Sequence, residues 1–381
     1  GVESVKSANR TVAAPSLALS TTTVNSFPTA LTGSLAQFSS GQAVTFRLDN
    51  ATTGVVLGGS ITPGAVPTDG TASVSVTIPS GTTNGSHTVY AVGSSGDVAS
   101  RAITVTAPAI STAVIQKAAG GDTAFVGRGT PYYVYGNVTG TGNPPAGFGS
   151  LTANVSTVTT GATAAPMTFG SYSIGATSYN YRSALLTSDP ALTAGSKSYS
   201  LTVTDVGGST KVSNFTVTAD ITQPSASNVQ TTNVTGGTAG LAQLGDTLVL
   251  TYSEQMDANS ILAGWTGTST PVVVRLNDGA TDTLTIFDAA NAAALPLGSV
   301  NLARADYTAS NITFGATGTA STMVRSAGVI TVTLGTPSAA ATTAAGTAVM
   351  SWTPSATAVD RAGNASTTTA RAESGTADID F

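Results

Sequence analysis

The chain has 381 residues, a length that allows two or three domains, each able to bury its own core. Only 9% of the residues are charged, the net charge is −5, and Lys and Arg together number 14, so we expect no nucleic-acid partner. The absence of cysteine excludes disulfides, thiolate metal sites and a cysteine nucleophile. Hydrophobic residues reach 41%, too many for a disordered chain, yet no apolar run approaches the roughly 20 residues of a membrane helix.

The N-terminal extension, residues 1–13, carries three spaced valines, Val2, Val5 and Val12. Three interpretations stay open: a leading strand, a free tail, or a strand donated to a neighbouring subunit. We interpret these valines as an assembly element.

Strand patterning then recurs along the chain. Period-two alternation beside turn residues predicts strands at Val44–Leu48, Val74–Ile78, Leu248–Tyr252, Val272–Leu276, Leu284–Ile286 and Ile330–Leu334. Helical patterning is confined to Ser260–Gly264, which follows Asp257 and Asn259 as possible caps, and Ala289–Leu295, which follows Asp288; we expect single helical turns there. The sequence therefore predicts an all-β architecture.

One hairpin pattern is written at Ser86–Val105 and again at Ser198–Val217, with a looser version at Val349–Ala370. In the second copy Leu201, Gly208 and Phe215 each lie 112 positions after their counterparts in the first. A unit of about 100 residues fits one whole β-sandwich. We therefore predict tandem immunoglobulin-like sandwiches at 14–107, 108–220 and 221–381, separated by stiff Pro-marked joints. The third segment is larger than one sandwich needs, which predicts inserted loops at Gly264–Thr270 and Ala289–Asp306.

Three segments carry a family resemblance. The run Ser86–Val92 resembles the penultimate strand of bacterial immunoglobulin-like domains of secreted and surface proteins. Gly245–Asp257 matches a strand followed by Ser-Glu-x-Met-Asp, and Ala358–Asn364 matches an Asp-x-Ala-Gly-Asn hairpin, both of the type found in actinobacterial exported proteins. The resemblance covers most of the first and third segments and is weaker in the second. It implies surface architecture such as stalks, fibres, sheaths, surface layers and adhesins, and it implies no reaction.

Residues for catalysis are scarce. His87 is the only histidine, and the repeat places Tyr199 at its equivalent position, which favours a structural role. Glutamate occurs only at Glu3, Glu254 and Glu373, and no aromatic-lined cleft is indicated around two acids. We predict no catalytic residue and no enzymatic activity.

Calcium is the best chemical alternative, because carboxylates near the ends of sandwiches can supply its oxygen ligands. The same residues could instead hydrogen-bond their own turns. The candidate ligands are Asp220, Glu254, Asp257, Asp360, Asn364, Asp378 and Asp380.

Two further features could act as contacts. Lys117 and Asn214 could lie on adjacent strands and form an isopeptide crosslink, although no acid is convincingly placed beside them. Aromatic residues could stack on sugars or form an interface, although Tyr133 and Tyr135 on one strand face are also explained by cross-strand packing. The candidate contact residues are Tyr132, Tyr133, Tyr135, Tyr179, Tyr181 and Trp265.

Together these features predict a non-enzymatic extracellular or cell-surface structural protein, a repeating subunit of a filament or surface layer that self-associates through strand edges. The alternative is a surface adhesin or carbohydrate-binding array that contacts cell-surface glycans. A hydrolase is the third class.

Overall fold

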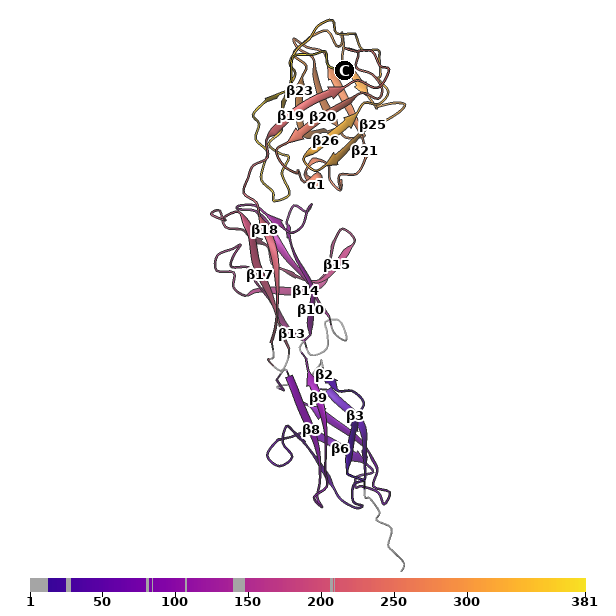
Figure 1. Ribbon diagram of the computed structural model, residues 1–381, viewed down its shortest axis with the longest axis vertical. Coiled ribbons are helices and arrows are strands. Elements are labelled where there is room, and N and C mark those ends of the chain that lie inside the picture. The colour runs from indigo at the N-terminus through magenta and orange to yellow at the C-terminus, as the bar shows by residue number, and fades with distance from the viewer. Residues whose placement is uncertain are drawn as a thin grey trace, which may run out of the picture.

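The computed structural model describes residues 13–24, 29–79, 82–83, 85–106, 108–139, 148–205, 208 and 210–381. These residues form three β-sandwiches in a row, with the first at one end of an elongated molecule and the third at the other (Figure 1). Each sandwich buries its own cluster of hydrophobic side chains. The predicted all-β, tandem immunoglobulin-like fold is confirmed.

The first sandwich has the strand pairing of an immunoglobulin domain. One sheet has the order β1 (Ser16–Leu19), β3 (Thr29–Ala36), β7 (Ala72–Ile78), β6 (Gly58–Thr62). The other has the order β2 (Thr23–Val24), β9 (Val98–Val105), β8 (Gly85–Gly93), β4 (Val44–Leu48), β5 (Val55–Val56). β2 runs parallel to β9 while the other pairs are antiparallel, so the two sheets correspond to strands A-B-E-D and A′-G-F-C-C′.

The second sandwich repeats this order with one strand shared between its sheets. Its path is β10 (Ala109–Lys117), β12 (Pro131–Thr139), β15 (Thr177–Ser183), β14 (Ala165–Ile174), β13 (Phe148–Asn154), β17 (Gly195–Asp205), β18 (Thr210–Ala219), β11 (Phe125–Val126), with β16 (Leu186–Thr187) on β12. β14 pairs with β13 at its start and with β15 further on, so it crosses between the sheets. β11 runs parallel to β18, as β2 does to β9.

The repeated hairpins are the last two strands of these sandwiches, β8–β9 and β17–β18, as the constant spacing predicts. The third copy at Val349–Ala370 is wrong. That stretch contains one short strand, β27 (Ser351–Thr353), whose partner β28 (Arg371–Ala372) comes only after a long loop. The tight hairpin of the third sandwich is instead β25 (Ser321–Ser326) with β26 (Val329–Thr333).

The third sandwich is larger and entirely antiparallel. One sheet contains β19 (Ala226–Thr232), β20 (Thr247–Tyr252), β26, β25 and the start of β21 (Thr270–Asn277). The other contains the rest of β21 with β24 (Ile312–Phe314), β22 (Thr283–Phe287), β23 (Ala294–Asn301), β27 and β28. Trp352 lies fully buried between the sheets and donates its indole N–H to the carbonyl of Leu297 at 2.7 Å.

The two predicted helices differ in outcome. Asp257 caps a single helical turn, α1 (Ala258–Ile261), by accepting the amide N–H of Asn259. The helix predicted over Ala289–Leu295 is wrong, because Asn291 adopts a left-handed φ of 56° that ends a turn and lets the chain enter β23. The insertion predicted at Ala289–Asp306 therefore contains a core strand rather than only a loop.

Candidate functional site at the second interdomain joint

The connection between the second and third sandwiches is hydrogen-bonded along its length. The amide of Asp220, which follows β18, donates to the carbonyl of Val126, and the Asp220 carboxylate accepts the amide of Thr222 at 3.0 Å. At the far end, the carbonyl of Pro224 accepts the amide of Thr367 at 2.9 Å. The segment is thus tied to both sandwiches and extended by its proline.

A turn of the third sandwich, residues 360–364, docks against the second sandwich; we call it the docking turn. The side chain of Asp360 is 1% exposed, and its Oδ1 accepts the amides of Ala362, Gly363 and Asn364 at 2.7–2.8 Å. A carboxylate that binds successive backbone N–H groups fixes the turn. The turn then presents the carbonyl of Ala362 to the amide of Gly127 in the second sandwich at 2.8 Å.

A buried ion pair lies beside the docking turn. Lys117, the last residue of β10, places its Nζ 2.9 Å from Oδ2 of Asp257, and both side chains are only 3% exposed. The Lys117 ammonium also donates to the carbonyl of Arg361. Removing one member of a buried pair leaves the other charge buried without a partner and destabilises the fold by about 3–5 kcal/mol. This pair therefore joins the two sandwiches.

The ion pair is surrounded by further contacts between the same two sandwiches. Arg361 Nε donates to Asp122 at 2.9 Å, and the Arg361 guanidinium lies 3.9 Å from the ring centroid of Phe125. Asn364 Nδ2 donates to the carbonyl of Asp220 at 3.0 Å. Because the contacts include charge pairs, hydrogen bonds and a stacked cation from several loops, the joint is fixed in more than one direction.

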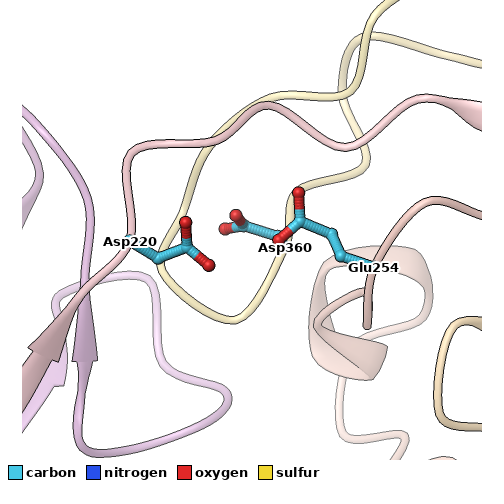
Figure 2. Close-up of side chains that lie close together, drawn as sticks. All are labelled: Asp220, Glu254 and Asp360. Carbon is cyan, nitrogen blue, oxygen red and sulfur yellow. The ribbon is translucent and has the colours of Figure 1, made fainter. Parts of the chain in front are cut away.

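Three carboxylates meet at this joint, and we call them the joint cluster: Asp220, Glu254 and Asp360. Figure 2 shows that they come from the interdomain connection, the segment before α1 and the docking turn. Their carboxylate oxygens lie within 4.8 Å of one another, and Oε1 of Glu254 is buried without a hydrogen-bond partner among the described residues. Burial, followed by the charges of Asp360 and Asp220, raises the pKa of Glu254 to about 7. Such a set is satisfied either by a proton or by a hard cation.

The other calcium candidates have different positions. Asp257 is not a member of the joint cluster, because its carboxylate is engaged by Lys117 and by the cap of α1. Asn364 contributes its amide as a donor to Asp360 rather than an oxygen to a cation. Asp378 and Asp380 meet Glu373, forming a second group of three acids that we call the end cluster. Sequence reasoning missed Glu373 as a partner, although it is one of only three glutamates.

The structure corrects four of the aromatic candidates and the crosslink. Tyr132, Tyr181 and Trp265 are 0%, 1% and 6% exposed because they pack inside their sandwiches, and Tyr135 is 7% exposed because neighbouring tyrosine rings cover it, so these four offer no contact surface. Lys117 is engaged at the joint by Asp257, whereas Asn214 lies in β18 opposite Ser200, so the proposed pairing of Lys117 with Asn214 is wrong.

The remaining tyrosines form an outer-face cluster on the second sandwich. Tyr135 is largely buried among Tyr133, Tyr179 and Tyr172, with ring centroids 5.6–6.2 Å away. The guanidinium of Arg182 lies 4.3 Å from the ring centroid of Tyr133 and 4.6 Å from that of Tyr172. Tyr133 and Tyr179 stay partly exposed. Tyr172 and Arg182 were missed, because only the pairing of β14 with β15 brings them to this face.

His87 lies in the first sandwich, away from both acidic clusters. Its Nδ1 is 2.8 Å from Asp49 and its Nε2 is 2.7 Å from the carbonyl of Thr83, so both ring nitrogens face oxygen acceptors. This arrangement favours the doubly protonated imidazolium and holds the ring as a strut. Val2, Val5 and Val12 lie outside the described residues, so the assembly element stays a prediction.

No family model and no curated protein matches the chain. Among solved structures it is similar to FdeC, an Escherichia coli adhesin, at 15% identity over 96% of this chain and 98% of that one, with a TM-score of 0.21. It is also similar to the Yersinia pseudotuberculosis adhesin InvE, at 13% identity over 67% and 70% of the two chains and a TM-score of 0.26. A tetra-tandem repeat from the extending region of a large adhesion protein gives 16% identity over 95% and 100%, with a TM-score of 0.23.

Likeness at TM-scores this low carries no argument about function. The immunoglobulin-like assignment therefore depends on the strand order and the parallel terminal pairs of the first two sandwiches. The actinobacterial type stays a prediction. Among the described residues, α1 with its four residues is far too short to cross a bilayer, and no other helix is a candidate.

Proposed function

We propose that this chain is a non-enzymatic structural protein of the cell exterior, a repeating subunit of a surface filament or surface layer. The observation that carries the proposal is the second joint, where the buried Lys117–Asp257 pair fixes two sandwiches as one stiff unit. A subunit of a regular assembly must hold its domains in one relative orientation, so it needs such a joint, whereas a chain of independently moving domains does not. The low charge of the chain supports close packing of copies, because repulsion between them is small.

The strand edge of the first sandwich supports self-association. β5 is the outermost strand of its sheet, and its two residues, Val55 and Val56, are 64% and 59% exposed. An exposed apolar edge strand is a template for pairing with another chain unless charge or proline blocks it. Subunits would therefore associate through this edge, with the N-terminal extension as a second assembly element.

Negative-stain electron microscopy of the full chain tests this proposal. We expect filaments or sheets from the native protein, and isolated rods from a Val55→Lys, Val56→Lys variant, because edge lysines oppose strand pairing. The control is Val324→Lys, since Val324 is also exposed but lies on β25, which has strands on both sides. Isolated rods from the native chain at every concentration, or polymers that survive the double substitution, would contradict it.

The alternative function, a surface adhesin or carbohydrate-binding array, is favoured by the tyrosines around Arg182. Partly exposed aromatic rings beside a cation can stack on a sugar ring and bind its hydroxyls. A glycan array with the native chain and with Tyr179→Ala tests it, using Tyr90→Ala in the first sandwich as a control. Selective binding lost only in Tyr179→Ala supports the adhesin, and uniform background opposes it.

Calcium is the cation that we propose for the joint cluster. The three acids offer oxygen ligands only, which suits a hard cation, and Glu254 keeps a buried oxygen without a donor in the part of the chain that the structure describes. Calcium should raise the stability of the native chain, and Glu254→Gln should weaken that response at the joint. An identical increase in stability with calcium in both proteins would contradict calcium binding at the joint cluster.

A further inference from the structure

The end cluster lies where the final described segment of the chain packs onto the third sandwich. Glu373 exchanges two hydrogen bonds with Met350: its Oε1 accepts the amide N–H at 2.9 Å, and its own amide donates to the carbonyl at 3.1 Å. The carbonyl of Asp378 accepts the amide of Ala348 at 2.9 Å. Asp380 Oδ1 accepts the hydroxyl of Thr231 in β19 at 3.1 Å. The three acids are therefore held by backbone and side-chain bonds from separate segments.

These fixed acids bring their carboxylates together in a mostly buried place. Oxygen atoms of Glu373, Asp378 and Asp380 lie within 4.8 Å of one another. Asp380 is 1% exposed and Glu373 is 8% exposed, whereas Asp378 reaches the solvent. Within the described residues, Oδ2 of Asp380 is buried and has no hydrogen-bond partner. Among the described residues, the group thus contains one buried acceptor without a hydrogen-bond donor.

The group has no cationic side chain as a partner among the described residues. Every ion pair among the described residues involves other acids, so no Lys, Arg or His is paired with this group. Neighbouring buried carboxylates without a counter-charge repel each other and lose hydration, a combination that proteins compensate with a proton or a metal ion.

We propose that Glu373, Asp378 and Asp380 bind a calcium ion, which fastens residues 373–380 to β19 and to the strand that begins at Ser351. The ligand set is carboxylate only, and the single histidine lies in the first sandwich, so nitrogen- and sulfur-seeking metals have no ligands here. Calcium accepts irregular geometry and several water ligands, which the solvent side at Asp378 can supply. Magnesium demands a tighter octahedron and gives up its water reluctantly.

The site does not depend on the proposed assembly function, because it lies within one sandwich. Its effect is local, because an ion that bridges the final described segment to β19 prevents local unfolding of that segment. Tyr307 provides a reporter, since its hydroxyl oxygen accepts the amide N–H of Asp380 at 2.9 Å. Terbium bound in place of calcium should therefore be sensitised by excitation of this tyrosine.

The experiment is calorimetric titration of the full chain, stripped with EDTA, with calcium chloride. We expect binding that persists in Glu254→Gln, where the joint cluster is impaired, and that weakens roughly tenfold or more in Asp378→Asn. Asp378 is exposed, so this variant should unfold at the same urea concentration as the native chain in EDTA. Sensitised terbium emission should fall in the same variant and not in Glu254→Gln.

The Asp380→Asn variant distinguishes calcium binding from protonation of Asp380 as the means of compensating the buried charge. If calcium binds, this variant is more stable than the native chain in EDTA, because a buried charge is gone, and when combined with Glu254→Gln it no longer responds to calcium. The proposal is overturned if the native chain and Glu254→Gln show no binding at about 10 mM calcium, a concentration above the weak extracellular range. It is also overturned if Asp378→Asn and Asp380→Asn bind calcium as tightly as the native chain.

Discussion

Replacing Lys117 with methionine should destabilise the contact between the second and third sandwiches. The substitution keeps most of the side-chain volume and removes the ammonium, which leaves Asp257 3% exposed and without its counter-charge. Breaking a buried pair in this way destabilises by about 3–5 kcal/mol. Asp257 would keep its bond to the amide of Asn259, so α1 should remain capped.

The size of the effect can be read from the third sandwich alone. Trp265 and Trp352 are the only tryptophans and both lie in its core, so tryptophan fluorescence reports its unfolding while the other two sandwiches are silent. With a urea slope of about 2 kcal/mol/M, a loss of about 3–5 kcal/mol lowers the unfolding midpoint by about 1.5–2.5 M. Lys211→Met, at an exposed position, is the control and should shift the midpoint by less than about 0.3 M, consistent with a surface substitution.

A double-mutant cycle distinguishes the pair from general loss of packing. Asp257→Asn preserves a capping side chain and removes the charge, so Lys117→Met with Asp257→Asn should recover part of the stability lost in either single variant. Unfolding of Lys117→Met within about 0.3 M of the native midpoint, or simple additivity of the two substitutions, would show that the ion pair does not stabilise the joint.

Three further predictions concern the rest of the molecule. Burial lowers the pKa of His87, but the hydrogen bond to Asp49 outweighs it and the pKa is raised above 6.5 in the folded state. The pair therefore stabilises the fold below pH 6.5, and this stabilisation is lost as the pH rises through the pKa of the folded state. Calorimetry should therefore show the first sandwich melting lower at about pH 8 than at about pH 6, and His87→Gln should abolish the difference. Glu254 binds its proton more tightly in the folded state, so the free energy of unfolding in EDTA should fall as the pH rises from 4.5 to about 7. At about pH 8, Glu254→Gln should raise the free energy of unfolding by about 1–2 kcal/mol, after allowance for solvent screening. A lower free energy of unfolding of this variant in urea would contradict this. Gly121→Ala should open the joint, because its Cβ would lie 1.9 Å from Oδ2 of Asp257 at a φ of +80°, and tryptophan-detected unfolding should show it; unchanged stability would contradict the packing.

The strands and the paired terminal hairpins could be predicted because a half-buried strand shows its period in the sequence. Val74, Val76 and Ile78 are all buried on one face of β7, as their alternation requires. The Ala289–Leu295 helix failed because the apolar spacing of a short run does not separate a turn leading into a strand from a helix.

The members of the joint cluster could be selected from their turn and joint positions, but their meeting could not. Asp220 and Asp360 are 140 positions apart and are brought together only by docking of the two sandwiches. The Lys117–Asp257 pair has the same origin, since a lysine at a strand end has no sequence signal that it will be buried by the next domain. Tertiary contacts of this kind lie beyond local pattern.

The contacts at the second joint make the second and third sandwiches move as one body, and residual dipolar couplings of the full chain measure this directly. If the joint is fixed as described, amide couplings from the described residues within 109–219 and from 226–381 fit one alignment tensor with the domain orientation of Figure 1. Two tensors of clearly different magnitude would mean that the sandwiches reorient independently, and the account of the joint would be wrong.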